Sequence, residues 1–392
     1  TGNTLAVHAF GAAAKDFEGV QNLHFYLPSG TAAAETRTML TLTHAPAVKD
    51  ISTLNLGVGA VAADARALRP GDAVSLLKVN GTLMTAGQPM NTGSAHTMTA
   101  SQGGTLDYTL ALAKRGENEL VATVQTVTVN EKSKSLVETR AAASAMLNAG
   151  ADLLTNVGFT AAASAAAETV PAAADAEGAR NTGGSRTAMP APESPAADGG
   201  FQPWAAQGGA AVRLHSGSYV DAKGWHLDVG FARRQRSGQS ALTYGPFVEH
   251  GRSTYNSYLD DGTHGSGKMS YTGGGMMARA ENAGGGYIEG SLRAGRVSSD
   301  YTGGYGGTDM SYDHASTYYA AHLGIGQERR LAGGDRIEGY AKYFYSHQGG
   351  NTTKLRSGAV YDFGSVDSHR LRVGARYTHA DSARSEIYAG LA

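Results

Sequence analysis

Few residues of this sequence have the types and the spacing that chemistry requires. The nearest match to a phosphate-binding loop is "GTHGSGKM", in which Gly262, Gly267 and Lys268 have P-loop spacing. Met269 stands where a Ser or Thr would bind magnesium, and the segment falls between two expected strands with no helix after it. We therefore predict an ordinary loop here.

Other possible sites are equally weak. The 13 His residues are scattered, with no HExxH pair and no close set of metal ligands. The run "DDGTH" at 260–264 could hold a cation, although a solvated loop explains it more simply. The absence of cysteine excludes disulfides and thiol chemistry. We predict no catalytic, cofactor-binding or metal-binding residue and no enzymatic activity.

Charged residues recur in the middle of expected strands in the C-terminal half of the sequence. In a closed sheet such charges could act in catalysis, but we favour the interpretation that they pair with one another and hydrate the interior. They are Glu289, Arg293, Glu338, Lys342, Arg370, Arg372 and Arg376.

The composition limits the class of protein. The 392 residues have a formal net charge of -1, which gives no reason to expect a nucleic-acid partner. Only 17% of the residues are charged, against roughly 25% in soluble chains. No window approaches the ~20 apolar residues of a membrane helix. A membrane β-barrel stays possible, because its strands are only half apolar.

Residues 1–128 consist of short β-like runs such as "NLHFYL" and "AVSLLKV", broken by Gly, Asn, Pro and Asp. Such runs are typical of a β-solenoid or a small sandwich. The run "TLDYTLALAKRGENELVATV" predicts a hairpin that turns at residues 115–118.

Residues 130–157 have the apolar spacing of a helix, and Ser135 with Glu138 matches a capping box. Gly150 would weaken this helix. The many small residues fit either a helix packed on a neighbour or a helix made thin for a narrow space. Residues 161–200 are rich in Ala, Pro and Gly, so we predict a disordered linker, with a short helix allowed at 161–168.

Residues 201–392 hold about nine segments in which apolar and polar residues alternate, as in half-buried strands. In "KGWHLDVGFARR" and "SHRLRVGARYTH", one face is apolar and the other is charged. The first segment places Trp204 on the apolar face, near a strand end.

The connecting segments differ between the two ends of these strands. Tight turns such as "RSGQ" and "ENAG" alternate with long polar loops such as "NSYLDDGTHGSG" and "TGGYGGTDMSYDHAS". This sorting is typical of an up-and-down outer-membrane barrel, whose outer face contacts lipid and whose lumen is wet. The predicted lipid-facing residues are Trp225, Leu227, Val229, Phe231, Leu371, Val373 and Tyr377. The predicted lumen-facing residues are Asp228, Arg234, Glu289, Arg293, Arg370, Arg372 and Arg376.

Three runs together resemble the C-terminal part of Gram-negative autotransporters, the type V secretion proteins. They are "SKSLVETRAAASAMLNAGADLL", then "PWAAQGGAAVRLHSGSYVDAKGWHLDVGFARR" after the linker, and "SEIYAGLA". The resemblance implies a barrel of about twelve strands in the outer membrane, a helix in its pore and a passenger delivered to the cell surface. It also implies outer-membrane lipid, the barrel assembly machinery and periplasmic chaperones as partners, and a monomeric barrel.

Two features depart from that family. Its members end on a terminal aromatic residue, whereas this sequence stops at Ala392, so we expect a barrel that lacks roughly its last quarter. Some members cut their own passenger free near an adjacent Asn pair. Asn148 and Asn156 are not adjacent, and we do not carry that activity over.

The predicted fold is thus mostly β: a β-solenoid-like passenger end (1–128), one helix (130–157), a linker (161–200) and a partial antiparallel membrane barrel (201–392). One alternative is a soluble secreted adhesin, with a β-solenoid and a soluble barrel or sandwich that buries the same apolar face inward. Another is an enzyme carried in the passenger, against which the lack of any recognisable site argues.

Overall fold

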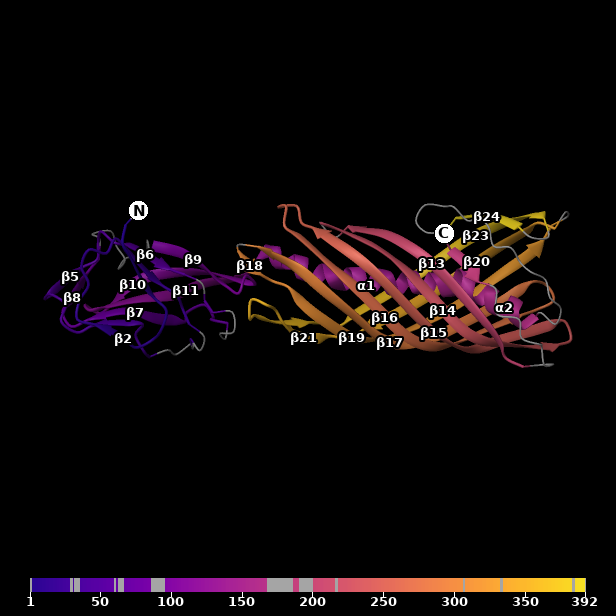
Figure 1. Cartoon of the computed structure of the whole chain (residues 1–392), viewed down its shortest axis with the longest axis horizontal. Coiled ribbons are helices and arrows are strands. Elements are labelled where there is room, and N and C mark those ends of the chain that lie inside the picture. Colours follow the sequence, from indigo (N-terminus) through magenta and orange to yellow (C-terminus); the bar gives the residue numbers. More distant parts are fainter. Residues whose placement is uncertain are drawn as a thin grey trace. The chain divides into compact units, whose positions relative to one another are not determined.

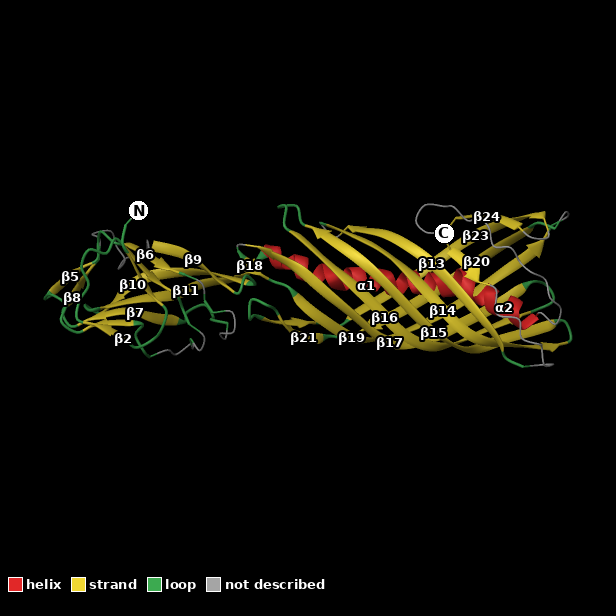
Figure 2. Cartoon of the chain, viewed as in Figure 1, coloured by secondary structure: helices red, strands yellow, loops and turns green. Residues whose placement is uncertain are grey.

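The computed structural model is mostly β and separates into two compact units (Figures 1 and 2). The first unit comprises Thr1–Lys134, Gly304–Ser311 and Lys354–Tyr361; the second comprises Ser135–Gly303, Tyr312–Thr353 and Asp362–Ala392. The structure describes residues 2–28, 31, 36–59, 61–62, 67–85, 96–167, 186–189, 200–215, 218–305, 307–331, 334–382 and 385–391.

The first unit begins with eight short strands that pair in parallel across three sheets. The sheets have the orders β1-β3-β6, β2-β4-β7 and β5-β8, so the chain passes from one sheet to the next and returns. Buried Leu23, Phe25, Leu42 and Leu77 fill the space between the sheets. The strands are β1 (Thr4–Val7), β2 (Ala12–Ala14), β3 (Asn22–Phe25), β4 (Leu40–Leu42), β5 (Val48–Asp50), β6 (Asn55–Val58), β7 (Ala73–Val79) and β8 (Thr82–Met84).

An antiparallel meander follows, formed by β9 (His96–Gln102), β10 (Leu106–Arg115) and β11 (Glu119–Val129). The predicted hairpin is confirmed, because β10 pairs with β11 from Arg115 opposite Glu119 onward. Gly116 in the turn has a φ of 64°, a left-handed conformation that favours glycine. β11 also pairs with β7, which attaches the meander to the parallel strands.

A helical segment links the first unit to the second. It consists of a short 3₁₀ helix η1 (Glu131–Ser133), helix α1 (Lys134–Leu153), a π-helical turn η2 (Leu154–Gly158) and helix α2 (Phe159–Ala167). The predicted capping box is wrong. The Asn130 side chain caps the helical segment instead, accepting from Lys132 N at 3.0 Å. Ser135 and Glu138 consequently lie inside the helical segment, where Ser135 bonds to Tyr301 of the sheet and Glu138 accepts from Ser218, just before β14.

The second unit is built on an antiparallel sheet whose strands follow chain order. Among the described residues of 202–391, nine strands follow one another in this sheet, which confirms the predicted up-and-down arrangement and the predicted number of strands. They are β13 (Gln202–His215), β14 (Tyr219–Ser237), β15 (Ser240–Tyr258), β16 (His264–Glu281), β17 (Gly286–Tyr305), β19 (Tyr312–Arg330), β20 (Arg336–Gln348), β23 (Val366–Ser382) and β24 (Ser385–Leu391). In Figure 1 these strands slant across α1 and curl around it.

The strands are longer than the alternation of residue types predicts. Much of the two polar segments expected to be loops belongs to strands, since β15 extends to Tyr258 and β17 to Tyr305. Pairing satisfies the backbone whatever the polarity of the side chains, so a polar sequence does not end a strand. Three short strands accompany these connections: β18 (Thr308–Asp309), β21 (Asn351–Lys354) and β22 (Val360–Phe363).

Two parts of the predicted linker have regular structure. Residues 161–167 belong to α2, and β12 (Arg186–Met189) pairs with the edge of β13. The rest, 168–185 and 190–199, lies outside the described residues. Among the described strands, β12 and β24 stand at the two ends of the strand order.

Candidate functional site

The two faces of the large sheet differ sharply in what they expose. On β14 the side chains of Trp225, Val229 and Phe231 lie exposed on the outer face, and Leu227 is partly exposed between them. On β23 the same holds for Leu371, Val373 and Tyr377, with Leu371 71% exposed. All residues predicted to face lipid therefore lie on the outer face. Contact with lipid stays a prediction.

The residues predicted to face the lumen have the opposite orientation. Asp228, Glu289 and Arg293 are buried inside the curled sheet. The others are partly buried and point the same way: Arg234, Arg370, Arg372 and Arg376.

Trp204 does not lie on the outer face, and that prediction is wrong. Its ring is buried, with its centroid 6.2 Å from that of Phe247, and it packs with Leu154 and Phe159 of the helical segment. The helical segment presents an apolar surface at this end of the unit, so an inward Trp finds apolar neighbours. The alternation on β13 separated two faces but did not reveal which one points inward.

One end of α1 is held by hydroxyl groups of the sheet. Tyr255 and Thr139 share a hydrogen bond of 2.8 Å, and Tyr312 donates to the carbonyl of Leu136 at 2.6 Å. Ser135 bonds to Tyr301 at 2.8 Å. Neutral groups thus fix the first turns of the helix at the end where the long connections lie.

Arg140, one turn further along, makes the densest set of bonds from the helix. Its buried guanidinium donates to the carbonyls of Gly349 (3.0 Å) and Gly364 (2.9 Å) and to that of Gln348 (3.3 Å). It also lies 2.9 Å from His314 Nε2. A guanidinium has five N–H donors in a fixed plane, which suits it to gather several carbonyls. Arg140 therefore ties the helix to both ends of the connection from β20 to β23.

The middle of the helix faces a buried ion pair. Arg293 donates to Glu249 at 2.7 Å, and Tyr318 donates to the same carboxylate at 2.6 Å. Arg293 also approaches the helix carbonyl of Leu147 at 3.5 Å. Gly150 lies against Tyr271, where a Cβ would come within 2.2 Å of the tyrosine hydroxyl oxygen. The helix is thin where the sheet presents large side chains, which supports the second of the two interpretations of its small residues.

Charged residues hold the last turns of α1 and the turn η2. Lys342 donates to the Thr155 carbonyl at 3.1 Å and pairs with Glu289 at 2.7 Å. Asp152 accepts from Arg370 at 2.8 Å and from Arg372 at 3.3 Å. The predicted pairing of inner charges is therefore found, with the helix supplying part of it.

Sequence reasoning missed several residues of this site. Arg140 and Asp152 are, with Lys134 and Glu138, the charged residues of a helix rich in small residues, and charges on such a helix are a signal that could have been used. Glu249 lies on a strand whose alternation is weak, and nothing local distinguishes it.

The segments considered for ions and phosphates have ordinary strand and turn structure. The strand β16 begins at His264 and includes Gly267 and Lys268, so the glycine-rich run is paired strand with no helix after it. Asp261 accepts from Thr263 N at 2.8 Å within a tight turn. Within the described ranges, no three His, Cys, Asp or Glu residues are grouped to hold a metal ion. Nor is any described helix long and apolar enough to cross a membrane.

Solved structures resemble this chain, and two of them are described here, whereas no family model and no curated protein matches it. The first is the beta domain of the Bordetella autotransporter BrkA, with a TM-score of 0.42 and 19% identity, covering 49% of this chain and 77% of that one. The second is the translocator domain of the autotransporter NalP from Neisseria meningitidis, with a TM-score of 0.42 and 16% identity, covering 64% of this chain and 76% of that one. Both are domains of the family that the sequence resembles.

Proposed function

We propose that the second unit is an autotransporter translocator, which anchors the chain in the outer membrane of a Gram-negative cell and delivers its N-terminal region to the cell surface. The observation that carries this proposal is the combination of an exposed apolar outer face with a polar inner face that encloses a helix. Neither feature alone would suffice.

The outer face supports the membrane part of the proposal. Large apolar side chains are exposed on successive strands, including Leu292, Leu323 and Leu371. A soluble protein rarely exposes a continuous apolar surface of this extent. Lipid would cover this surface. The antiparallel pairing provides hydrogen-bond partners for the backbone N–H and C=O groups, which lipid cannot provide.

The inner face supports the transport part. Besides two apolar clusters that it forms with the sheet, the helix is held by hydrogen bonds and ion pairs, as the bonds of Arg140, Asp152 and Thr155 illustrate. Such contacts can be exchanged for water as a chain moves through the lumen. In this proposal the helical segment is the last part of the chain to occupy the pore, and the linker after it joins the pore to the first barrel strand.

Residues 1–128, which make up most of the first unit, are then the C-terminal end of the passenger. Its three parallel sheets and closing meander support assignment as the end of a β-solenoid. Folding of this end at the cell surface would bias export outward. The barrel assembly machinery and periplasmic chaperones are the proposed partners of a monomeric barrel, and no reaction is required.

A soluble surface adhesin is the competing function. It requires that the apolar outer face is either covered by another protein or left in contact with water. The test is to express the chain in a Gram-negative host and to separate membranes from soluble material. Recovery in the detergent fraction, with a gel mobility that changes on heating, supports the translocator. Recovery in the aqueous fraction without detergent, with no heat-modifiable band, would contradict it.

A further inference from the structure

The rim of the sheet at the tight turns is rich in arginine. From β14 to β20 it carries Arg233, Arg234, Arg236, Arg329, Arg330 and Arg336. The carboxylates of the same rim are Glu281, Glu328 and Asp335. The arginines outnumber the carboxylates, so this rim has an excess of positive charge.

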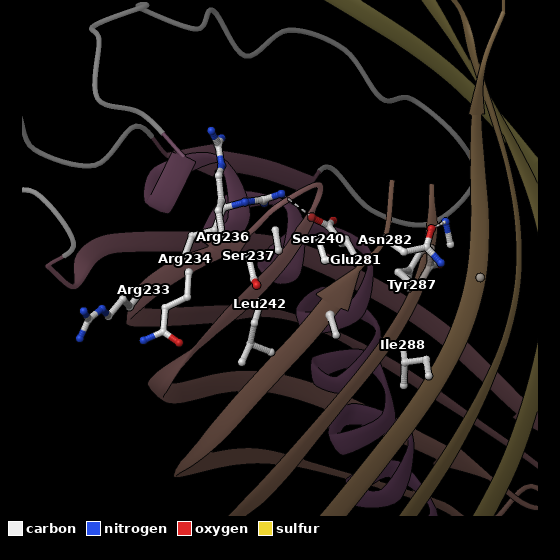
Figure 3. A pocket seen from close by; sticks show the side chains of 15 residues that line it. Arg233, Arg234, Arg236, Ser237, Ser240, Leu242, Glu281, Asn282, Tyr287 and Ile288 are labelled. Carbon is white, nitrogen blue, oxygen red and sulfur yellow. Dashed lines mark hydrogen bonds and ion pairs between the residues drawn. The ribbon is translucent and has the colours of Figure 1, made fainter. Parts of the chain in front are cut away.

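Part of that excess has no partner within the sheet. Glu281 is already shared, since Arg234 reaches it at 2.5 Å and Arg279 at 3.0 Å. In the described part of the chain, no hydrogen bond or ion pair joins the guanidinium of Arg233 or Arg236 to another group. Figure 3 shows Arg234 extending toward Glu281 while Arg233 and Arg236 extend in other directions.

These arginines border a groove of about 1000 Å³ whose opposite side is apolar. Leu242 and Ile288 line that side, and Ile288 is 58% exposed. Cross-strand pairing places Leu242 opposite Ala280, and Ala280 opposite Ile288, so the apolar side continues across three strands of the outer face. The groove therefore lies where the apolar outer band meets the positive rim.

We infer that this groove binds an anionic glycerophospholipid, with its anionic headgroup at the rim that carries Arg233 and Arg236 and an acyl chain along Leu242 and Ile288. The inference rests on the proposed function, because only a barrel in a membrane presents the groove to lipid. A guanidinium matches a phosphate in charge and in the geometry of its donors. The apolar side matches an acyl chain, which a free phosphate or a nucleotide lacks. A phospholipid bound here would indicate that the tight-turn end of the barrel lies in a leaflet made of phospholipid.

The experiment uses the full chain, purified in a neutral detergent and reconstituted into nanodiscs. Phosphatidylglycerol and phosphatidylethanolamine are compared as ligands by intact mass spectrometry of the protein with its retained lipids. The test variant is Arg233→Gln with Arg236→Gln. The control is Arg213→Gln with Arg252→Gln, which removes the same charge from exposed arginines near the other end of the strands.

We expect the wild type and the control to retain phosphatidylglycerol in preference to phosphatidylethanolamine. The test variant should lose that preference, by about five-fold for each arginine removed. Its heat-modifiable mobility should be unchanged, which shows that the barrel is intact.

Three results would overturn the inference. Equal losses in the two double variants would show a response to overall charge. Displacement of the lipid by inorganic phosphate at equal concentration would show an anion site that makes no use of Leu242 and Ile288. If the wild type inserts and is heat-modifiable but shows no preference between the two lipids, the lipid site is contradicted while the proposed function stands. If instead the wild type fails to enter nanodiscs, the proposed function itself is wrong.

Discussion

Gly150 of α1 lies against Tyr271 of β16 so closely that a Cβ at this position would be 2.2 Å from the tyrosine hydroxyl oxygen. The same hydroxyl bonds to His226 Nδ1 at 2.9 Å, so the tyrosine is held in place from the side of the sheet. The absence of a side chain at Gly150 therefore lets the helix pack closely against the sheet at Tyr271.

The first prediction concerns this contact. Gly150→Ala should destabilise the second unit, although alanine is the better helix former by about 1 kcal/mol. Tyr271→Phe removes the hydroxyl, so the double variant should lose less stability than the sum of the two single changes. Thermal unfolding of the four proteins in detergent measures the coupling. Simple additivity would show that Gly150 and Tyr271 do not meet.

The second prediction concerns Arg140. Arg140→Gln should release the connection between β20 and β23, because three carbonyls lose their charged donor. A hydrogen bond to a charged group contributes about 1.5–3 kcal/mol, so amide exchange at residues 349 and 364 should accelerate strongly. Arg140→Lys keeps the charge but cannot reach all three carbonyls, and its exchange should be intermediate. Identical exchange in all three proteins would refute the role of Arg140.

The third prediction concerns the buried pair of Arg293 and Glu249. Arg293→Met should cost about 3–5 kcal/mol, because it leaves a carboxylate buried without its cation. Adding Glu249→Gln should restore much of the lost stability, since no buried charge of the pair is then left alone. Chemical unfolding in detergent compares the two variants. A double variant less stable than the single one would contradict this account.

The fourth prediction separates a membrane barrel from a soluble one on a single strand. Val248 and Thr254 both lie exposed on the outer face of β15. In a membrane, Val248→Arg places a charge in the apolar band and should cost about 2–4 kcal/mol, whereas Thr254→Arg should be tolerated. Assembly is read from the heat-modifiable band in isolated membranes. Because both positions are exposed, a soluble fold would tolerate both changes alike.

The fifth prediction concerns pH and the first unit. The hydrogen bond from Arg115 holds the pKa of Glu119 below its ordinary value of 4.5, aided by a hydrogen bond from Ser75. A carboxyl group whose pKa is lowered by folding contributes stability above its unfolded pKa, and that contribution is lost as the pH falls through the folded pKa. The protection of amides in β10 and β11, measured relative to their intrinsic exchange rate at each pH, should therefore fall below pH 4.5 in the wild type. In Glu119→Gln it should depend less on pH over the same range, and an unchanged dependence would contradict the prediction.

Much of the architecture follows from local pattern. Alternation along residues 225–231 separates an apolar from a polar face, because side chains of a strand alternate whatever the strand packs against. The run at residues 115–118 places a turn between two strands, since the apolar runs on either side have strand length. The spacing of Leu136, Met146 and Leu153 gives a helix for the same local reason.

Only the tertiary structure decided which face of a strand lies inside and which residues meet there. Trp204 points inward because the apolar helical segment covers the inner face at that position. Asp152 meets Arg370 across 218 positions of sequence, a partnership that no local pattern specifies. Alternation along a strand defines two faces but does not say which of them points inward. An ion pair forms only where the fold brings two elements together. The sequence by itself determined the elements and their two faces, while the packing of the helix inside the curled sheet determined the interior.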